Sequence, residues 1–137
     1  MPWNLNTDRP IYLQLVDIIS FRIISGIYSA GTKLPSVRDL ASEASVNPNT
    51  MQKALAELES TGLIFANRTS GRFVTEDNSL IRDAKRKLAK EYSEEIITKL
   101  RELGLSNEEI KATIADILDN WYYFNKYILT TFYVIIH

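Results

Sequence analysis

The hydrophobic positions at the start of the chain repeat with the period of a helix. Between Pro10, which suits a first helical turn, and Gly26, which suits a helix end, apolar residues recur at every fourth position: Ile11, Leu15, Ile19 and Ile23. Such a stripe lies on one face of a helix and buries that face against a core. The pattern predicts a first helix over residues 10–25.

Two shorter helices are expected next, each opened by a capping residue. Ser36 and Asp39 have the spacing of a capping box, which predicts the start of a second helix. Asn47 can cap a third helix, with Pro48 in its first turn and Gly62 at its end. The inward stripe of this third helix is Met51, Ala54, Leu55 and Leu58.

Two short apolar runs follow, over residues 63–66 and 72–74, and the polar loop from Asn67 to Gly71 separates them. Short apolar runs joined by a loop that contains glycine predict a β-hairpin. Residues 75–79 are polar and charged, which favours a domain boundary there. Two helices joined by a tight turn and followed by a hairpin suit a winged helix-turn-helix, whose second helix enters the major groove of DNA.

The rest of the chain carries amphipathic helical patterns. One covers residues 80–103 and ends at Gly104, and a second starts at a capping box formed by Ser106 and Glu109. A long helix with one apolar face needs a partner, so we expect a dimer interface made by Ile81, Leu88, Tyr92, Ile96, Leu100, Ile114, Ile117 and Trp121. The expected fold is mainly α with a small β-hairpin: a winged helix-turn-helix domain over residues 1–76 and a helical dimerisation region over residues 80–137.

The last 17 residues, 121–137, are strongly apolar and aromatic, with Lys126 as their charged residue. A hydrophobic extension of the dimer interface is the favoured interpretation, because large exposed apolar patches mark contact sites. Membrane association is disfavoured, because a spanning helix needs roughly 17 to 25 residues with its aromatics at the ends. A poorly ordered tail that is foreign to the rest of the chain is the third alternative.

The amino-acid composition limits the kinds of functional site that the chain can form. With 45% hydrophobic and 24% charged residues the chain is expected to fold. It has no cysteine, and its one histidine is the terminal His137, so we expect no catalytic site, no metal and no cofactor. The N-terminus does not resemble a secretory signal, and we expect a cytoplasmic protein with no membrane partner.

Bulk charge does not by itself indicate a polyanion binder, since the net charge is −1. Between Lys33 and Val74 the basic residues number five and the acidic residues four. Affinity for DNA must therefore come from the placement of individual cations.

Residues 9–75 contain a series of motifs in a fixed order: Pro10-Ile-Tyr-Leu-Gln14, Gly26-Ile-Tyr28, Gly31, Lys33-Leu-Pro-Ser-Val-Arg-Asp-Leu-Ala41, Val46-Asn-Pro-Asn-Thr50, Lys53-Ala-Leu55, Leu58-Glu59, Gly62-Leu-Ile64, Arg68 and Gly71-Arg-Phe-Val74. Through these motifs the sequence resembles the GntR family of bacterial regulators. This resemblance implies a transcription regulator that binds a double-stranded DNA operator.

The resemblance also implies which residues meet DNA. Arg38 would contact a phosphate or guanine, and Ser36 would add a DNA contact to its capping role. The start of the third helix would present Asn47, Asn49 and Thr50. We assign adenine readout to Gln52 and a phosphate contact to Lys53, and the wing tip would comprise Arg68, Thr69, Ser70 and Gly71. Without the family resemblance, Arg38 would be interpreted as a surface ion-pair partner of Asp39 or Glu43.

The short region after Ser79 and the Asn-Pro-Asn-Thr variant resemble the YtrA-like subfamily, although many GntR members carry arginine where this chain has Pro48 and another near Gln52. The subfamily pattern implies a homodimer joined by two C-terminal helices. We expect a repressor acting on a palindromic operator, with half-sites about one helical turn, roughly 34 Å, apart. The sequence assigns no small-molecule effector. The alternative function is a protein- or membrane-interaction module that uses the winged-helix scaffold and the apolar tail.

Overall fold

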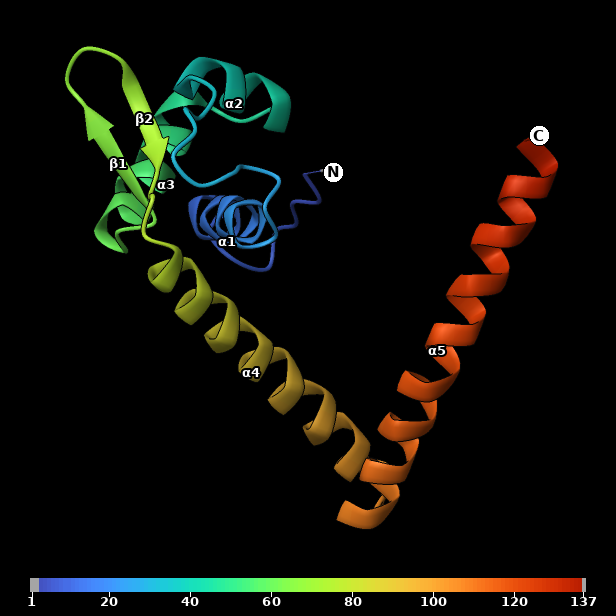
Figure 1. Ribbon diagram of the computed structural model, residues 1–137. Coiled ribbons are helices and arrows are strands. Elements are labelled where there is room, and N and C mark those ends of the chain that lie inside the picture. Colours follow the sequence, from blue (N-terminus) through green and yellow to red (C-terminus); the bar gives the residue numbers. More distant parts are fainter. Residues whose placement is uncertain (1–2, 137) are drawn as a thin grey trace. The chain divides into compact units, whose positions relative to one another are not determined.

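The computed structural model describes the backbone of residues 3–136 and, in α5, side chains as far as Trp121 together with Lys126 (Figure 1). These residues form α1 (Ile11–Ile24), α2 (Val37–Ala44), α3 (Pro48–Ser60), β1 (Ile64–Asn67), β2 (Gly71–Val74), α4 (Asn78–Glu102) and α5 (Asn107–Ile136). The predicted fold class, mainly helical with one small hairpin, is confirmed. The chain divides into two compact units, residues 1–88 and 89–137, and each is described by itself.

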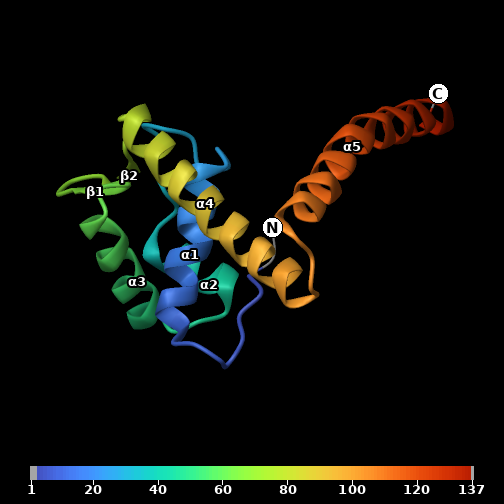
Figure 2. The same ribbon diagram turned by 90° about the horizontal axis from the view of Figure 1, so that it is seen from below.

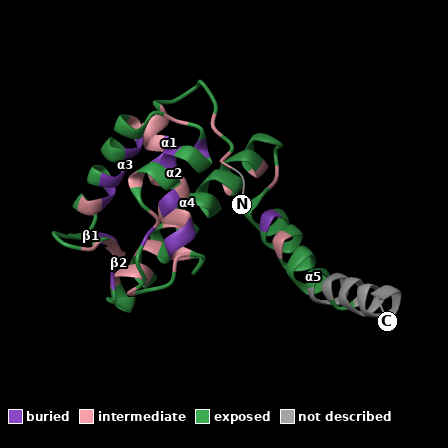
Figure 3. Ribbon diagram, turned by 90° about the horizontal axis from the view of Figure 1, so that it is seen from above, coloured by how far each residue is buried: buried purple, intermediate pink, exposed green. Residues whose placement is uncertain are grey.

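The first unit is built around the inward faces of α1 and α3. The stripes predicted from the sequence are buried, and Leu15, Ile19, Met51 and Leu58 are wholly inaccessible to solvent. Leu40 of α2 and the hairpin residues Ile64 and Val74 complete this core. The three helices gather beside the hairpin in Figure 2, and Figure 3 marks the buried positions of the chain in purple. Burial of these apolar faces is what fixes the helices against one another.

The hairpin has a third partner in the segment that precedes α2. β1 and β2 are antiparallel, with Ile64 opposite Val74 and Phe65 opposite Phe73. On the other edge of β2, Lys33 forms a bridge with Phe73. Leu34 N donates to Arg72 O at 2.9 Å, and Val74 N donates to Thr32 O at 2.9 Å. The free edge of β2 thus satisfies the backbone groups of residues 32–34 and brings the start of α2 beside the wing.

The caps predicted for the first unit are present. Ser36 Oγ accepts a hydrogen bond from Asp39 N at 3.1 Å, and Asn47 Oδ1 accepts one from Asn49 N at 2.8 Å. Between them α2 ends at Ser45, whose φ of 54° is left-handed. This residue lets the chain turn directly from α2 into α3.

Asp77 opens α4. Its carboxylate accepts a hydrogen bond from the hydroxyl of Ser79 and others from Ser79 N at 3.0 Å and Leu80 N at 3.2 Å. The hydrogen bond from the Ser79 side chain is the largest cause of a lowered pKa of Asp77, relative to its usual value of 3.8, and the two backbone bonds lower it further. A lowered pKa in the folded state means that this carboxylate favours folding above that value and loses the effect as the pH falls through its folded pKa.

The N-terminal segment is fastened to α1 by two buried polar side chains. The Gln14 amide accepts from Asn6 N at 2.9 Å and donates to the carbonyls of Asn6 at 2.9 Å and Arg9 at 2.8 Å. The Arg22 guanidinium lies 4.1 Å from the centre of the Trp3 ring. It also donates to the Tyr28 hydroxyl at 2.9 Å. The Gln14 amide is therefore satisfied in a position where an unpaired polar group would be costly.

The first turns of α4 belong to the first unit, because Leu80, Ile81 and Ala84 pack against its core. The polar segment 75–79 therefore does not end the compact unit, which continues to residue 88. Ile81 is half-buried in this contact.

The second unit consists of the rest of α4 and all of α5. The predicted capping box is present and reciprocal: Ser106 N donates to Glu109 Oε1 and Glu109 N donates to Ser106 Oγ, both at 3.2 Å. Ile110 is buried in this unit. Large apolar side chains nevertheless remain more than half exposed in the single chain, among them Ile96, Leu103, Ile117, Leu118 and Trp121.

The backbone of the apolar tail continues α5 as one helix to Ile136. The packing expected of Tyr122, Phe124, Tyr127, Ile128, Phe132 and Ile135 lies outside the described side chains. Within the described part of the chain, no helix is both long and apolar enough to cross a membrane.

We predict that Ile19→Ala lowers the free energy of unfolding by about 2 to 5 kcal/mol, because it leaves a cavity in a close-packed core. Ile27, with 53% of its surface exposed, is the matched control. Ile27→Ala is expected to change the same quantity by no more than about 0.5 kcal/mol. Urea denaturation followed by circular dichroism measures both values, and equal losses in the two variants would contradict this description of the core.

Candidate nucleic-acid interface

The start of α3 is the part of the helix-turn-helix that stands free of the core. Asn47, Pro48 and Asn49 are exposed and Thr50 is half-buried, whereas Met51 turns inward. Backbone N–H groups at a helix start carry partial positive charge and attract anions. The sequence placed its polar contact residues at this exposed end, and the structure brings them together there.

One turn further along α3, the two remaining candidate residues, Gln52 and Lys53, differ in what their side chains contact. Gln52 is exposed, and it lies on the same outward face as Asn49 because the two are three residues apart. Lys53 is also exposed, but its ammonium lies 3.9 Å from the centre of the Tyr12 ring of α1. This cation–π contact directs the Lys53 side chain toward α1.

Arg38 occupies the second position of α2 and is exposed. The sequence alone allowed an ion pair with Glu43, but Glu43 is 3.7 Å from Arg22 instead. In the described part of the chain no ion pair or side-chain hydrogen bond engages Arg38. Its guanidinium is therefore available to a ligand at the start of α2.

The wing tip is a compact turn. Asn67 Oδ1 accepts hydrogen bonds from Thr69 N at 3.2 Å and from the Thr69 hydroxyl at 3.1 Å. Gly71 has a φ of 100°, which a residue with a side chain rarely adopts. A Cβ at this position would lie 3.2 Å from Lys33 Cε, so the lysine side chain runs close over Gly71.

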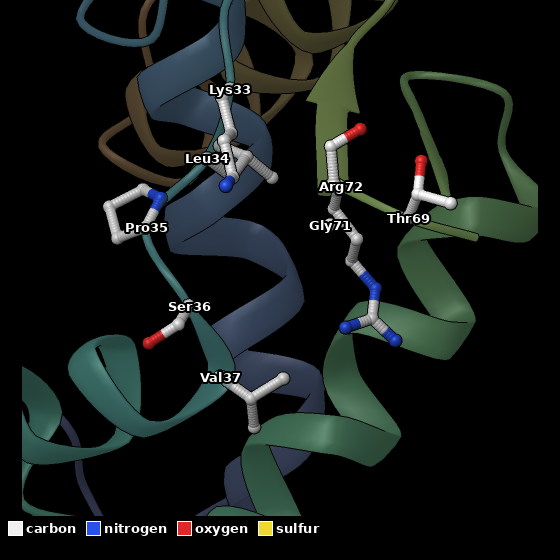
Figure 4. Close-up of a pocket in the computed structure, with 9 residues that line it drawn as sticks. Lys33, Leu34, Pro35, Ser36, Val37, Thr69, Gly71 and Arg72 are labelled. Carbon is white, nitrogen blue, oxygen red and sulfur yellow. The ribbon is translucent and has the colours of Figure 1, made fainter. Parts of the chain in front are cut away.

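A shallow groove of about 360 Å³ lies between the entry to α2 and the wing. Residues 33–37 form one wall and residues 69–72 the other (Figure 4). The groove unites Ser36 with Thr69, Ser70 and Gly71, residues from two separate sequence motifs. In the sequence, Arg38 directly follows the wall formed by residues 33–37, and Arg68 directly precedes the wall formed by residues 69–72.

The structure adds three residues that the sequence analysis did not select. Lys33 lines the groove, exposed, and forms no ion pair with any described residue. Arg72 Nε is 2.6 Å from Glu59 Oε1, a link between β2 and the end of α3. The sequence signal for Lys33 was its position directly before the Leu-Pro-Ser motif, whereas the Arg72–Glu59 contact spans 13 positions and carried no local signal.

The groove and the helix starts offer binding chemistry of one kind: exposed cations, amides and hydroxyls. Among the described residues, no group of three His, Cys, Asp or Glu side chains could hold a metal ion. Phosphate oxygens and base edges are the ligands that such donors fit.

Comparison with known proteins places this arrangement in a family. Residues 11–74 match the family described as bacterial regulatory proteins, gntR family. The chain is 38% identical to the HTH-type transcriptional regulator YhcF of Bacillus subtilis over 107 residues, which cover 78% of this chain and 88% of YhcF. It is 34% identical to the HTH-type transcriptional repressor YtrA of the same organism, with 81% of this chain and 86% of YtrA covered.

Solved structures agree with the sequence relatives. A GntR family transcriptional regulator from Listeria monocytogenes superimposes with a TM-score of 0.75 at 40% identity, over 82% of this chain and 98% of that one. A transcriptional regulator from Oenococcus oeni gives a TM-score of 0.71 at 34% identity, over 83% and 95%. Because these matches extend beyond the winged helix into the C-terminal helices, the chain belongs to the gntR family of bacterial regulatory proteins, as a DNA-binding transcription regulator of the YtrA-like type.

Proposed function

We propose that this protein is a repressor that binds a palindromic operator as a homodimer. The observation that carries the proposal is the groove in which the entry to α2 faces the wing tip, together with the exposed polar start of α3. The relative YtrA, named a transcriptional repressor, supports the direction of regulation. A regulator that binds DNA acts where the chromosome is, so we place this protein in the cytoplasm.

In this proposal α3 is the recognition helix. Asn47, Asn49 and Thr50 meet phosphate or base edges at its start, and Gln52 reads adenine in the major groove. Lys53 donates to a phosphate while the Tyr12 ring holds its ammonium in place. The cation–π contact leaves the N–H groups on the far side of the ammonium available for this bond.

The other two contacts flank α3. Arg38 and Ser36 hold the backbone or a guanine from the start of α2. Arg68, Thr69, Ser70 and Gly71 enter the neighbouring minor groove, where the absence of a side chain at Gly71 permits a close backbone approach. Lys33, on the wall of the groove beside the wing, adds a further positive charge to the same edge.

Dimerisation is assigned to the exposed apolar face of the C-terminal helices. Its members are Leu88, Tyr92, Ile96 and Leu100 of α4 and Ile114, Ile117 and Trp121 of α5. Ile81, at the start of the stripe, packs partly against the core of its own chain and is the weakest member. Leu88, Leu100 and Ile114 are half-buried, whereas Tyr92, Ile96, Ile117 and Trp121 are exposed in the single chain. Exposed side chains of this size are expected to be covered by a second copy, which also supplies the second recognition helix.

We predict that Arg38→Ala weakens binding to a duplex selected from a random-sequence pool by about 1 to 3 kcal/mol, since a charge-assisted contact is lost. Titration of the labelled duplex at a fixed salt concentration measures the change. Arg86→Ala, an exposed arginine of α4 away from the interface, is the control and should bind normally.

The same pair of variants tests repression. Wild-type protein and Arg86→Ala should lower in vitro transcription from a promoter that overlaps the selected duplex, and Arg38→Ala should not. A rise in transcript would make the protein an activator, and normal binding by a folded Arg38→Ala variant would refute the proposed contact.

Substitutions of Gln52 and Lys53 should have different effects on DNA binding, because the two residues make different kinds of contact. We predict that Gln52→Ala alters preference at one base position, because base-edge bonds carry sequence information. Lys53→Ala should weaken binding to all duplexes alike. It should also lower the slope of log affinity against log salt concentration by about one. Selection on random duplexes and titration at several salt concentrations measure these effects, and the reverse pattern would exchange the two roles.

Ile96→Asp is predicted to weaken the dimer at least about tenfold, because it places a charge in the apolar interface. Ile96 is 52% exposed in the single chain, so the substitution should leave the fold intact. Thr98→Asp, exposed on the same helix two positions away, is the control. Sedimentation equilibrium gives both dissociation constants, and an unchanged dimer in Ile96→Asp would move the interface elsewhere.

A further inference from the structure

We infer that Arg72 is a positioning residue: through its ion pair with Glu59 it holds the wing at a fixed place relative to α3, and so sets the affinity for DNA. The inference rests on the proposed contact between the wing and DNA. Neither residue is among those proposed above to touch DNA.

The ion pair is unusual within this chain. The Arg72 Nε to Glu59 Oε1 distance is 2.6 Å, and the side chains are 18% and 31% exposed. The Arg9–Asp17 pair, at 2.9 Å, is 55% and 60% exposed, and the lysine pairs along α4 are more exposed still. The Arg22–Glu43 pair has a more buried arginine, but it is longer, at 3.7 Å, and Glu43 is 51% exposed. Among the described ion pairs, Arg72–Glu59 is the shortest and the one in which both side chains are mostly buried. Because partial burial reduces screening by water and salt, this pair is expected to restrain geometry.

The location of the pair gives it this role. Glu59 is the second-last residue of α3, and Arg72 is the second residue of β2, next to Gly71 of the wing. In Figure 4 the Arg72 side chain runs from the strand toward the green helix α3. The Arg72 carbonyl meanwhile accepts from Leu34 N at 2.9 Å. One residue thus joins the wing to both other elements of the interface.

The pairing of residues 32–34 with β2 and the stacking of Phe65 on Phe73 hold the strands of the wing, but few side chains of its outer half reach the core. Ile64 and Val74 anchor its base in the core, but Phe65, Ala66 and Asn67 are exposed. A hairpin with two strands of four residues is marginal without packing. A wing already held in place loses less conformational entropy when it binds DNA, which favours affinity.

A direct DNA contact by Arg72 is the competing explanation, and the sign of one substitution separates the two. Glu59→Gln removes a negative charge close to a polyanion, so on electrostatic grounds alone it should tighten binding. If Glu59 acts by holding Arg72, the same substitution should loosen the wing and weaken binding. Arg72→Gln weakens binding under both explanations and cannot decide.

The experiment uses the full chain and the selected duplex. We expect Glu59→Gln and Arg72→Gln each to weaken binding about 3- to 10-fold, with the double variant no weaker than Arg72→Gln, because both remove one interaction. The exchanged pair Arg72→Glu with Glu59→Arg should recover part of the affinity. Arg9→Gln, which breaks the exposed pair with Asp17, is the matched control and should bind as wild type.

A second readout does not involve DNA. Heteronuclear NOE values of the Thr69 and Ser70 amides should fall in Glu59→Gln and Arg72→Gln and rise again in the exchanged pair, while thermal unfolding verifies that each variant is folded. Unchanged NOE values, with equal or tighter DNA binding by Glu59→Gln, would overturn the inference. Lower NOE values with unchanged affinity would refute the effect on binding and, with it, the proposed wing contact.

Discussion

The packing of α1 against α3 is the interaction on which the rest of the molecule depends. Leu15 and Ile19 meet Met51, Leu55 and Leu58 in a core from which solvent is excluded. Because the apolar stripe of α3 must face α1, its other face, with Asn49 and Gln52, has to point outward. The hairpin closes the same core through Ile64 and Val74, so the wing is set by the packing that orients the recognition helix.

A net charge of −1 is compatible with DNA binding because the charges are distributed unevenly. Several acidic groups of the first unit are engaged: Asp17 with Arg9, Glu43 with Arg22 and Glu59 with Arg72. Lys33, Arg38 and Arg68 form no ion pair with any described residue. Lys33 lines the groove, and Arg38 and Arg68 are sequence neighbours of its two walls, so the local field that a polyanion meets there differs from the average of the chain.

The C-terminal helices differ from the first unit in what stabilises them. Their ends are specified locally, by Asp77 for α4 and by the reciprocal pair Ser106 and Glu109 for α5. Many of their large apolar side chains, among them Ile96, Ile117 and Trp121, however, remain exposed in the single chain, in contrast to the closed core of the first unit. A helix pair with satisfied ends and an uncovered face is stable in its backbone yet incomplete in its packing.

The sequence by itself determined the helices, the hairpin, the caps and the family, because periodicity, capping and turn preferences act over a few neighbouring residues. It also pointed to Arg38 and to the polar start of α3. Only the tertiary structure decided that residues 32–34 pair with β2, that Lys53 lies over Tyr12, and that Arg72 reaches Glu59. These contacts join positions far apart in the chain, and the core that brings them together leaves no local pattern at the residues themselves.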